Sequence, residues 1–223
     1  MNMPFYVAPE QVMKDRADYA RKGIARGRSL IAFRYDNGIA ICAENASSTL
    51  RKISEIYDRI AFAGVGKYNE FEQLRIGGIR RADLTGYAYS RSDVTAKSLA
   101  NAYAQALGNI FTQEVKPYEV ELMVVEIGNE PDDKRIFRVT YDGTLFADRR
   151  FSAIGGEEDS LLEALDDAYE EEAPLVEVLG WTKAACASLE EDGVAPGNWE
   201  AAVVDKTNGR RAFRRLEPDE IDA

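Results

Sequence analysis

Residues 30–44 read LIAFRYDNGIAICAE, two apolar runs that flank the short polar segment Asp36-Asn37-Gly38. An Asn-Gly pair readily adopts the positive φ angles that a tight hairpin turn requires. β-branched and aromatic residues on both sides of such a turn are typical of paired strands. The stretch therefore predicts a β-hairpin, and the elements before and after it can be placed relative to this hairpin.

The segment before the hairpin predicts an amphipathic helix over residues 9–22. Its apolar residues recur at the spacing of one helix face: Met13, Ala17, Ala20 and Ile24. Pro9 suits the first helical position, and Gly23 permits a stop. Because such a helix can simply pack on the edge of a domain, its presence alone assigns no role.

The rest of the chain alternates between runs of strands and runs of helices. We expect strands at 50–56 and 59–66, helices at 67–84 and 92–113, strands at 118–127, 135–141, 144–148 and 150–154, helices at 158–170 and 174–190, and strands at 198–206 and 210–216. Ser92 or Asp93 is placed to cap the helix expected at residues 92–113. Segregated runs argue for antiparallel sheets covered by helices, an α+β fold, and against alternating βαβ units.

The composition of the chain excludes several classes of protein and of catalytic site. A chain of 223 residues with 45% hydrophobic residues is expected to form one domain. It contains no apolar stretch long enough for a membrane span and no secretion signal, so we expect a cytoplasmic protein that does not enter a membrane. The absence of histidine excludes a Ser-His-Asp triad and imidazole metal ligands within this chain. Cys42 and Cys186 are expected to be buried as small apolar residues.

The net charge of −11 argues against nucleic-acid binding, because phosphate neutralisation needs a basic surface. The charge is uneven along the chain. Thirteen acidic residues and one lysine give residues 157–192 a net charge of −12, so the rest of the chain carries +1. Solvated helix faces account most simply for the acidic run, and a dedicated docking surface is the alternative.

A short glycine motif, Gly64-Val65-Gly66-Lys67, follows an expected strand and precedes an expected helix. A phosphate-binding loop would also need a glycine upstream and a Ser or Thr after the lysine, whereas Tyr68 stands there. The motif therefore predicts a tight strand-to-helix turn, and we expect no nucleotide or other cofactor.

Several segments together resemble one family. They are DYARKGIARGRS, LIAFRYDNGIAICAE, LRKISEIYDRIAFAGVGKYNEFEQL, LANAYAQALGNIFTQ, KPYEVELMVVE and the closing RRAFRR. They resemble the α subunit of the proteasome core particle in its actinobacterial form, and the resemblance covers nearly the whole chain. It implies the four-layer αββα sandwich of the N-terminal-nucleophile hydrolases, with two five-stranded antiparallel sheets flanked by helices.

The resemblance leaves two functional classes to distinguish. An active peptidase of this fold uses a hydroxyl at the very start of the first strand, assisted by its own free amino group. Ser29 stands there in this chain, and Glu44 and Lys52 occupy places similar to the assisting acid and lysine of catalytic relatives. The strand begins without a threonine, however, and the preceding segment matches the α-type helix and not a dispensable propeptide. A non-catalytic ring subunit is therefore the preferred hypothesis.

The resemblance also implies partners and sites. It implies a homo-heptameric α ring stacked on proteasome β subunits, a docked ring-shaped ATPase activator, and unfolded, pupylated protein substrates. Residues 1–8 would form a flexible gate over the pore, with Pro4, Phe5, Tyr6 and Val7 as the plug. A loop of Gln113, Glu114, Val115 and Lys116 would narrow the entry channel. Lys52 would bind the C-terminal carboxylate of the activator.

Three ranges divide the chain on this interpretation. Residues 1–8 are the gate segment, residues 9–217 are the single domain, and residues 218–223 are a short acidic tail. Catalytic residues are not expected within this chain, and neither are metal ligands.

Overall fold

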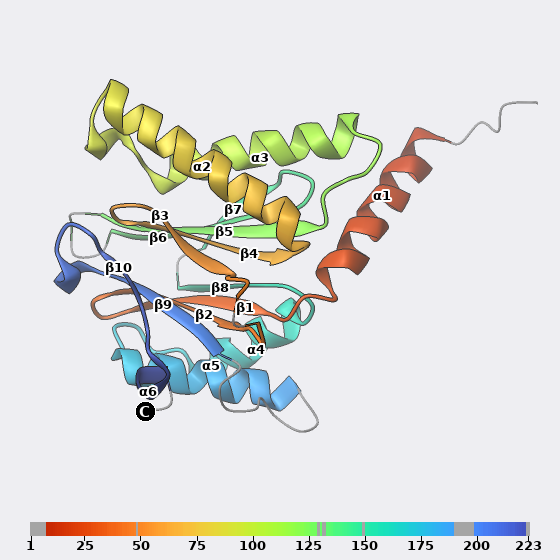
Figure 1. Cartoon of the computed structure of the whole chain (residues 1–223). Coiled ribbons are helices and arrows are strands. Elements are labelled where there is room, and N and C mark those ends of the chain that lie inside the picture. Colours follow the sequence, from red (N-terminus) through yellow and green to blue (C-terminus); the bar gives the residue numbers. More distant parts are fainter. Residues whose placement is uncertain are drawn as a thin grey trace, which may run out of the picture.

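The computed structural model describes residues 8–47, 49–128, 130, 133–148, 150–189 and 199–221. Two five-stranded sheets lie face to face, and a pair of helices covers the outer face of each (Figure 1). All strand pairs are antiparallel. The four-layer αββα sandwich predicted from the sequence is thereby confirmed.

The first sheet has the order β10-β9-β2-β1-β8. Its strands are β1 (Leu30–Tyr35), β2 (Gly38–Glu44), β8 (Phe151–Ile154), β9 (Trp199–Asp205) and β10 (Phe213–Arg215). The expected hairpin is formed by β1 and β2, with Tyr35 opposite Gly38 at the turn. The outer face of this sheet is covered by α4 (Glu158–Ala168) and α5 (Leu175–Leu189).

The second sheet has the order β3-β4-β5-β6-β7. Its strands are β3 (Ile53–Tyr57), β4 (Ile60–Gly66), β5 (Val120–Ile127), β6 (Lys134–Val139) and β7 (Leu145–Asp148). Its outer face carries α2 (Tyr68–Ala88) and α3 (Ala96–Gln113). Two short 3-10 helices, η1 (Arg91–Asp93) and η2 (Lys206–Asn208), complete the connections.

Alternating side chains divide the apolar core into three layers, because successive strand residues point to opposite faces. One layer lies between the two sheets and contains Ile39, Ile41, Val125 and Ile154. A second lies between the first sheet and α4–α5, and includes both cysteines, which form no disulfide and are buried as expected. The third lies between the second sheet and α2–α3. Most of the apolar core therefore lies in three packed layers.

The leading helix α1 (Pro9–Ile24) stands at one side of the sandwich (Figure 1). It runs past Gly23, where the sequence predicted a stop, because Ile24 still packs in a small cluster with Ala20 and Tyr141. Apolar burial therefore outweighs the low helix propensity of one glycine, which costs about 1 kcal/mol.

Two local expectations need correction. The cap of α3 is Thr95, whose side chain accepts a hydrogen bond from the N–H of Ser98 at 3.2 Å. Ser92 and Asp93 belong instead to η1, which begins after Ser90. At the other end of the chain, Pro218–Ile221 forms helix α6, and Ile221 is buried against the first sheet, so these tail residues pack on the domain.

The turn at Gly66 requires glycine. Its φ is +110°, and an added Cβ would lie 1.9 Å from the backbone carbonyl oxygen of Glu119. Such a close approach of two backbones explains the glycine motif before α2 as a strand-to-helix turn.

Candidate functional site

Lys52 lies in the connection between β2 and β3, one residue before β3 begins. Its ammonium nitrogen Nζ donates hydrogen bonds of 2.8 Å to the backbone carbonyl oxygens of Arg28 and Glu44. These acceptors stand just before β1 and at the end of β2, so the lysine joins the second sheet to the open end of the hairpin. An ammonium group has three N–H donors, and among the described residues the third donor of Lys52 has no hydrogen-bond acceptor.

Burial lowers the pKa of Lys52 from its ordinary value of 10.5 to about 8. The nearby carboxylates of Glu44 and Glu200 oppose this shift, and the guanidinium of Arg28 adds to it. Desolvation disfavours the charged form of a lysine, and carbonyl oxygens compensate only in part. The result is a cation whose charge is costly in the free chain and which a carboxylate ligand would stabilise.

Behind Lys52 stands a buried carboxylate, that of Glu200 on β9, which is 3% exposed. It accepts hydrogen bonds from the backbone N–H groups of Lys52 at 2.9 Å and Ile53 at 3.2 Å, and from the side-chain amide of Asn45 at 2.7 Å. Arg215 pairs with the same carboxylate at 2.7 Å and donates to the carbonyl of Ile53. This network fixes the backbone at Lys52.

A cavity of about 360 Å³ opens beside these groups. Its polar wall is formed by Arg28, Ser29 and Glu44, and its apolar side by Leu161, Cys186 and Leu189. The carboxylate of Glu44 lies 3.4 Å from the guanidinium of Arg28. The structure therefore brings together Ser29, Glu44 and Lys52, the three residues that the sequence analysis placed at the position of a catalytic centre.

The arrangement has only part of the chemistry of a nucleophilic centre. Ser29 follows α1 along the chain, and its nitrogen lies within a peptide bond, so it has no free amino group to act as a base. The ammonium of Lys52 is bound to two carbonyl oxygens. These groups suit the binding of an acidic group better than proton transfer from a serine.

The expected channel loop begins at the C-terminal end of α3. Val115 is 95% exposed at its tip. Lys116 is held by the carboxylates of Glu70 at 2.5 Å and Glu119 at 2.8 Å. Arg16 of α1 donates hydrogen bonds to the carbonyls of Phe111 and Glu114. The loop is thus tied to both α1 and α2, while its apolar tip faces solvent.

The other expected site, the plug of Pro4, Phe5, Tyr6 and Val7, lies outside the described residues. Over the described ranges, the structure contains no group of three or more Cys, Asp or Glu side chains that could hold a metal ion. Within those same ranges every helix is too short or too polar to cross a lipid bilayer.

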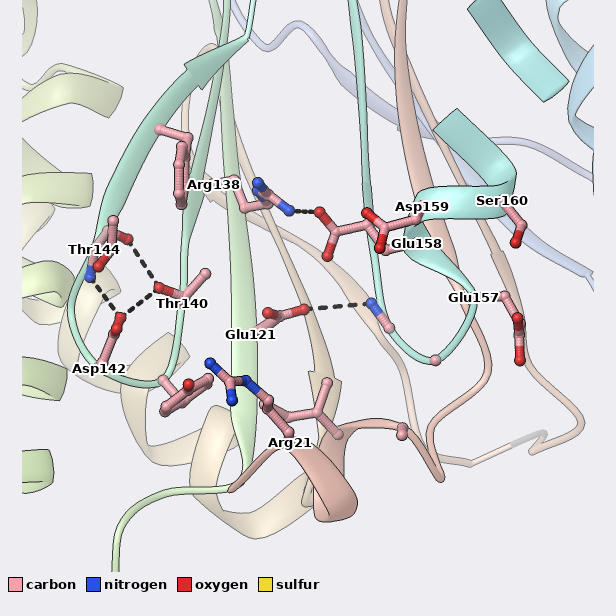
Figure 2. A pocket seen from close by; sticks show the side chains of 16 residues that line it. Arg21, Glu121, Arg138, Thr140, Asp142, Thr144, Glu157, Glu158, Asp159 and Ser160 are labelled. Carbon is pink, nitrogen blue, oxygen red and sulfur yellow. Dashed lines mark hydrogen bonds and ion pairs between the residues drawn. The ribbon is translucent and has the colours of Figure 1, made fainter. Parts of the chain in front are cut away.

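One cavity was missed by the sequence analysis. It measures about 540 Å³ and lies between the C-terminal end of α1, the β6–β7 turn and the β8–α4 connection (Figure 2). Glu121 of β5 forms part of its wall and is only 8% exposed. The available signal was an acidic residue within the apolar strand sequence VELMVVEI, because a glutamate in such a run is either paired or exposed to a cavity.

Comparison with known proteins agrees with this geometry. The family model described as "Proteasome subunit" matches residues 24–204. A protein of Acidimicrobium ferrooxidans named "Proteasome subunit alpha" is 53% identical over 221 residues, which cover 99% of this chain and 95% of that protein. Proteins with the same name from Xylanimonas cellulosilytica and Kineococcus radiotolerans are 53% and 54% identical, each over 97% of this chain and over 93% and 94% of their own lengths.

Proposed function

Because the chain belongs to the proteasome subunit family, we propose that it is a non-catalytic α-type subunit of a bacterial proteasome core particle. The observation that carries this proposal is the position of Ser29. A helix joined to the body by hydrogen bonds from Arg16 precedes the serine in the chain. A threonine-type peptidase of this fold would need that segment removed.

The proposed assembly is a homo-heptameric ring that stacks on a ring of β subunits and forms the entry pore for unfolded proteins. Head-to-tail contacts between unlike surfaces close into rings when the rotation allows it. Residues 1–8 would gate the pore, and the exposed Val115 would line the channel. The names of the relatives in actinobacteria support the α assignment. Pupylated proteins are the proposed substrates, and the cytoplasm is the proposed location.

Lys52 is the proposed anchor for a ring-shaped ATPase. Two of its donors are used by backbone carbonyls, which leaves the third for the C-terminal carboxylate of the activator. An ammonium suits this role as a point charge. The neighbouring Arg28 lines the cavity beside it, and its guanidinium lies 3.4 Å from the Glu44 carboxylate.

The test is co-expression of this chain with a β partner from the same organism. We expect rings of seven copies by native mass spectrometry, an intact mass that retains residues 9–28, and peptidase activity that is unchanged in Ser29→Ala. A mature species that begins at Ser29, together with activity lost in Ser29→Ala, would favour the alternative of an active peptidase subunit.

A further inference from the structure

The cavity missed from the sequence has more carboxylates than guanidinium groups in its wall (Figure 2). Its acidic residues are Glu121, Asp142, Glu157, Glu158 and Asp159, and its basic residues are Arg21 and Arg138. Both guanidinium groups have a carboxylate beside them. Arg138 is paired with Glu158, and Arg21 lies 3.7 Å from Asp18 on its own helix. The cavity therefore carries excess negative charge and suits a cation.

Glu121 is the acid that most needs such a ligand. Its side chain is 8% exposed, and among the described residues its single hydrogen-bond donor is the N–H of Gly155, at 3.3 Å. Figure 2 shows one carboxylate oxygen directed toward Gly155 and the other toward the side of the β6–β7 turn, where Asp142 lies. A buried carboxylate with one long hydrogen bond is poorly compensated, and a cation beside it would supply the missing interaction.

The electrostatics of Glu121 agree with this geometry. Burial raises the pKa of its carboxyl group. The guanidinium of Arg138 opposes the shift, and the negative charge of Asp142 adds to it. Two carboxylates thus repel each other across one part of the cavity, and a cation between them would remove the repulsion.

A second acidic group lies on the opposite side of the cavity. Glu157 and Asp159 come from the β8–α4 connection and the start of α4, and both are exposed. Figure 2 shows them well separated from Asp142. The same wall includes the apolar side chains of Ile24 and Phe146. Two separate acidic groups and an apolar wall match a compound whose two ammonium groups are joined by a methylene chain.

The size of the cavity and its donor set favour an organic cation. Its volume of about 540 Å³ falls within the range of about 300–1,000 Å³ that is typical of small-molecule sites. A metal ion is a poorer fit, because the described part of the chain contains no group of three or more acidic or cysteine side chains that could hold one.

We propose that this cavity binds a linear diammonium compound of the polyamine class. One ammonium group would lie between Glu121 and Asp142, and the other near Glu157 and Asp159. An ammonium group has three N–H donors, so the inner one can bind two carboxylates at once. Because the C-terminal end of α1 forms part of the wall, the ligand would also join this helix to β5 and to the β8–α4 connection. The site lies within a single chain, so the inference goes beyond the proposed function and does not depend on ring formation.

Titration calorimetry of the full chain with 1,5-diaminopentane, at constant ionic strength, tests the site. Pentylamine is the matched probe, because it has the same carbon chain and only one ammonium group. We expect the diamine to bind about threefold to tenfold more tightly, since its outer ammonium would meet two exposed carboxylates. It should also raise the melting temperature of the chain, because a ligand that binds only the folded state stabilises it.

Variants separate the two ends of the site. Glu121→Gln should weaken the binding of both probes by about tenfold or more, as expected for loss of a charge-assisted hydrogen bond. The variant should fold, because glutamine retains an acceptor for the N–H of Gly155 and removes a buried charge. Glu157→Gln combined with Asp159→Asn should reduce the affinity for the diamine to that for pentylamine and leave pentylamine binding unchanged. Glu163→Gln, at an exposed position of α4 outside the cavity, is the matched control and should bind both probes as wild type does.

The outcomes distinguish this inference from the proposed function. A wild-type chain that binds the diamine no better than pentylamine, or a folded Glu121→Gln variant with unchanged affinity, would overturn the site and leave the proposed function intact. A chain that binds the diamine as expected but forms no ring with its β partner would overturn the proposed function alone.

Discussion

The Nζ atom of Lys52 lies 2.8 Å from the backbone carbonyl oxygen of Glu44, while the carboxylate of Glu44 lies 3.4 Å from the guanidinium of Arg28. The lysine is thus positioned by the backbone and not through a direct hydrogen bond to this carboxylate. Consequently a change of Lys52 breaks no hydrogen bond to the Glu44 carboxylate.

Lys52→Ala should weaken the binding of an activator C-terminal peptide to the assembled particle by about one to two decades. A charge-assisted hydrogen bond contributes about 1.5–3 kcal/mol, and 1.4 kcal/mol corresponds to a factor of ten. The melting temperature should change little, because the lost bonds to Arg28 and Glu44 are offset by removal of a poorly solvated charge. Fluorescence anisotropy with a labelled peptide measures the affinity. Normal affinity with a destabilised ring would show that Lys52 is structural.

Peptide affinity should also depend on pH. Below about pH 8 Lys52 is charged in the free chain, and above that value it loses its proton. A bound carboxylate favours the charged form, so the Kd should rise about tenfold per pH unit above pH 8 until the pKa of the complex is reached. Lys52→Arg, which stays charged, should give a flat profile over the same range.

The lowered pKa of Lys52 also predicts how this residue's contribution to the free energy of unfolding changes with pH. The folded pKa of Lys52 lies below the ordinary value of 10.5, so the unfolded chain binds more protons between about pH 8 and pH 10.5. The contribution of this residue to the free energy of unfolding should therefore rise with pH across that window. Urea denaturation of wild type and Lys52→Ala at pH 7.5 and pH 9.5 measures this contribution. It is the difference between their free energies of unfolding at each pH. A difference that stays constant would contradict the shifted pKa.

Glu200→Ala should destabilise the isolated chain by about 2–6 kcal/mol, because two backbone N–H donors lose their acceptor at about 1–3 kcal/mol each. The change leaves Arg215 without its buried partner and removes the acceptor for the N–H groups of Lys52 and Ile53. Urea denaturation measures the loss. Glu220→Ala serves as the control, because Glu220 pairs with Arg214 at an exposed position and should cost less than about 1 kcal/mol. If both substitutions lowered the free energy of unfolding equally, the Glu200 network would stabilise the fold no more than an exposed ion pair.

Deletions should separate the gate from the assembly element. Removal of residues 2–8 should speed peptide hydrolysis by the particle and leave assembly intact. Removal of residues 2–22 also takes away Arg16, which binds the carbonyls of Phe111 and Glu114, and Ala20, which is fully buried. That longer deletion should reduce ring yield. Hydrolysis of a fluorogenic peptide and native mass spectrometry report the two effects, and unchanged hydrolysis after the short deletion would count against a gate.

The sequence predicted the elements whose signals are local. The hairpin follows from Asn37-Gly38 and its flanking strands, and the layer architecture follows from the order of strands and helices. The end of α1 and the start of α3 differ from the predicted positions, because packing at Ile24 and capping by Thr95 determine them. Within the candidate site, Lys52 was identified by resemblance, but its partners could not be predicted.

The contacts that the sequence could not predict join residues that are far apart along the chain. Glu200 lies 148 residues from Lys52 along the chain, and the two meet only because β9 and β3 are in sheets that pack face to face. Glu121 and Gly155 are likewise brought together by β5 and the end of β8. No spacing rule links such pairs, so a buried acid in a strand can be noticed from sequence, but its function depends on the assembled sandwich.

The Glu200 network also has a mechanical consequence. Lys52 belongs to the connection that enters the second sheet, and its backbone N–H is bound to a carboxylate of the first sheet. A tensile load applied at Lys52 would therefore be shared by both sheets at once. An ATPase that pulls a polypeptide inward pushes back on the surface that supports it. In the proposed particle this reaction force would act on the subunit at Lys52, where a hydrogen bond to Glu200 joins the two sheets. It would not act on a flexible loop.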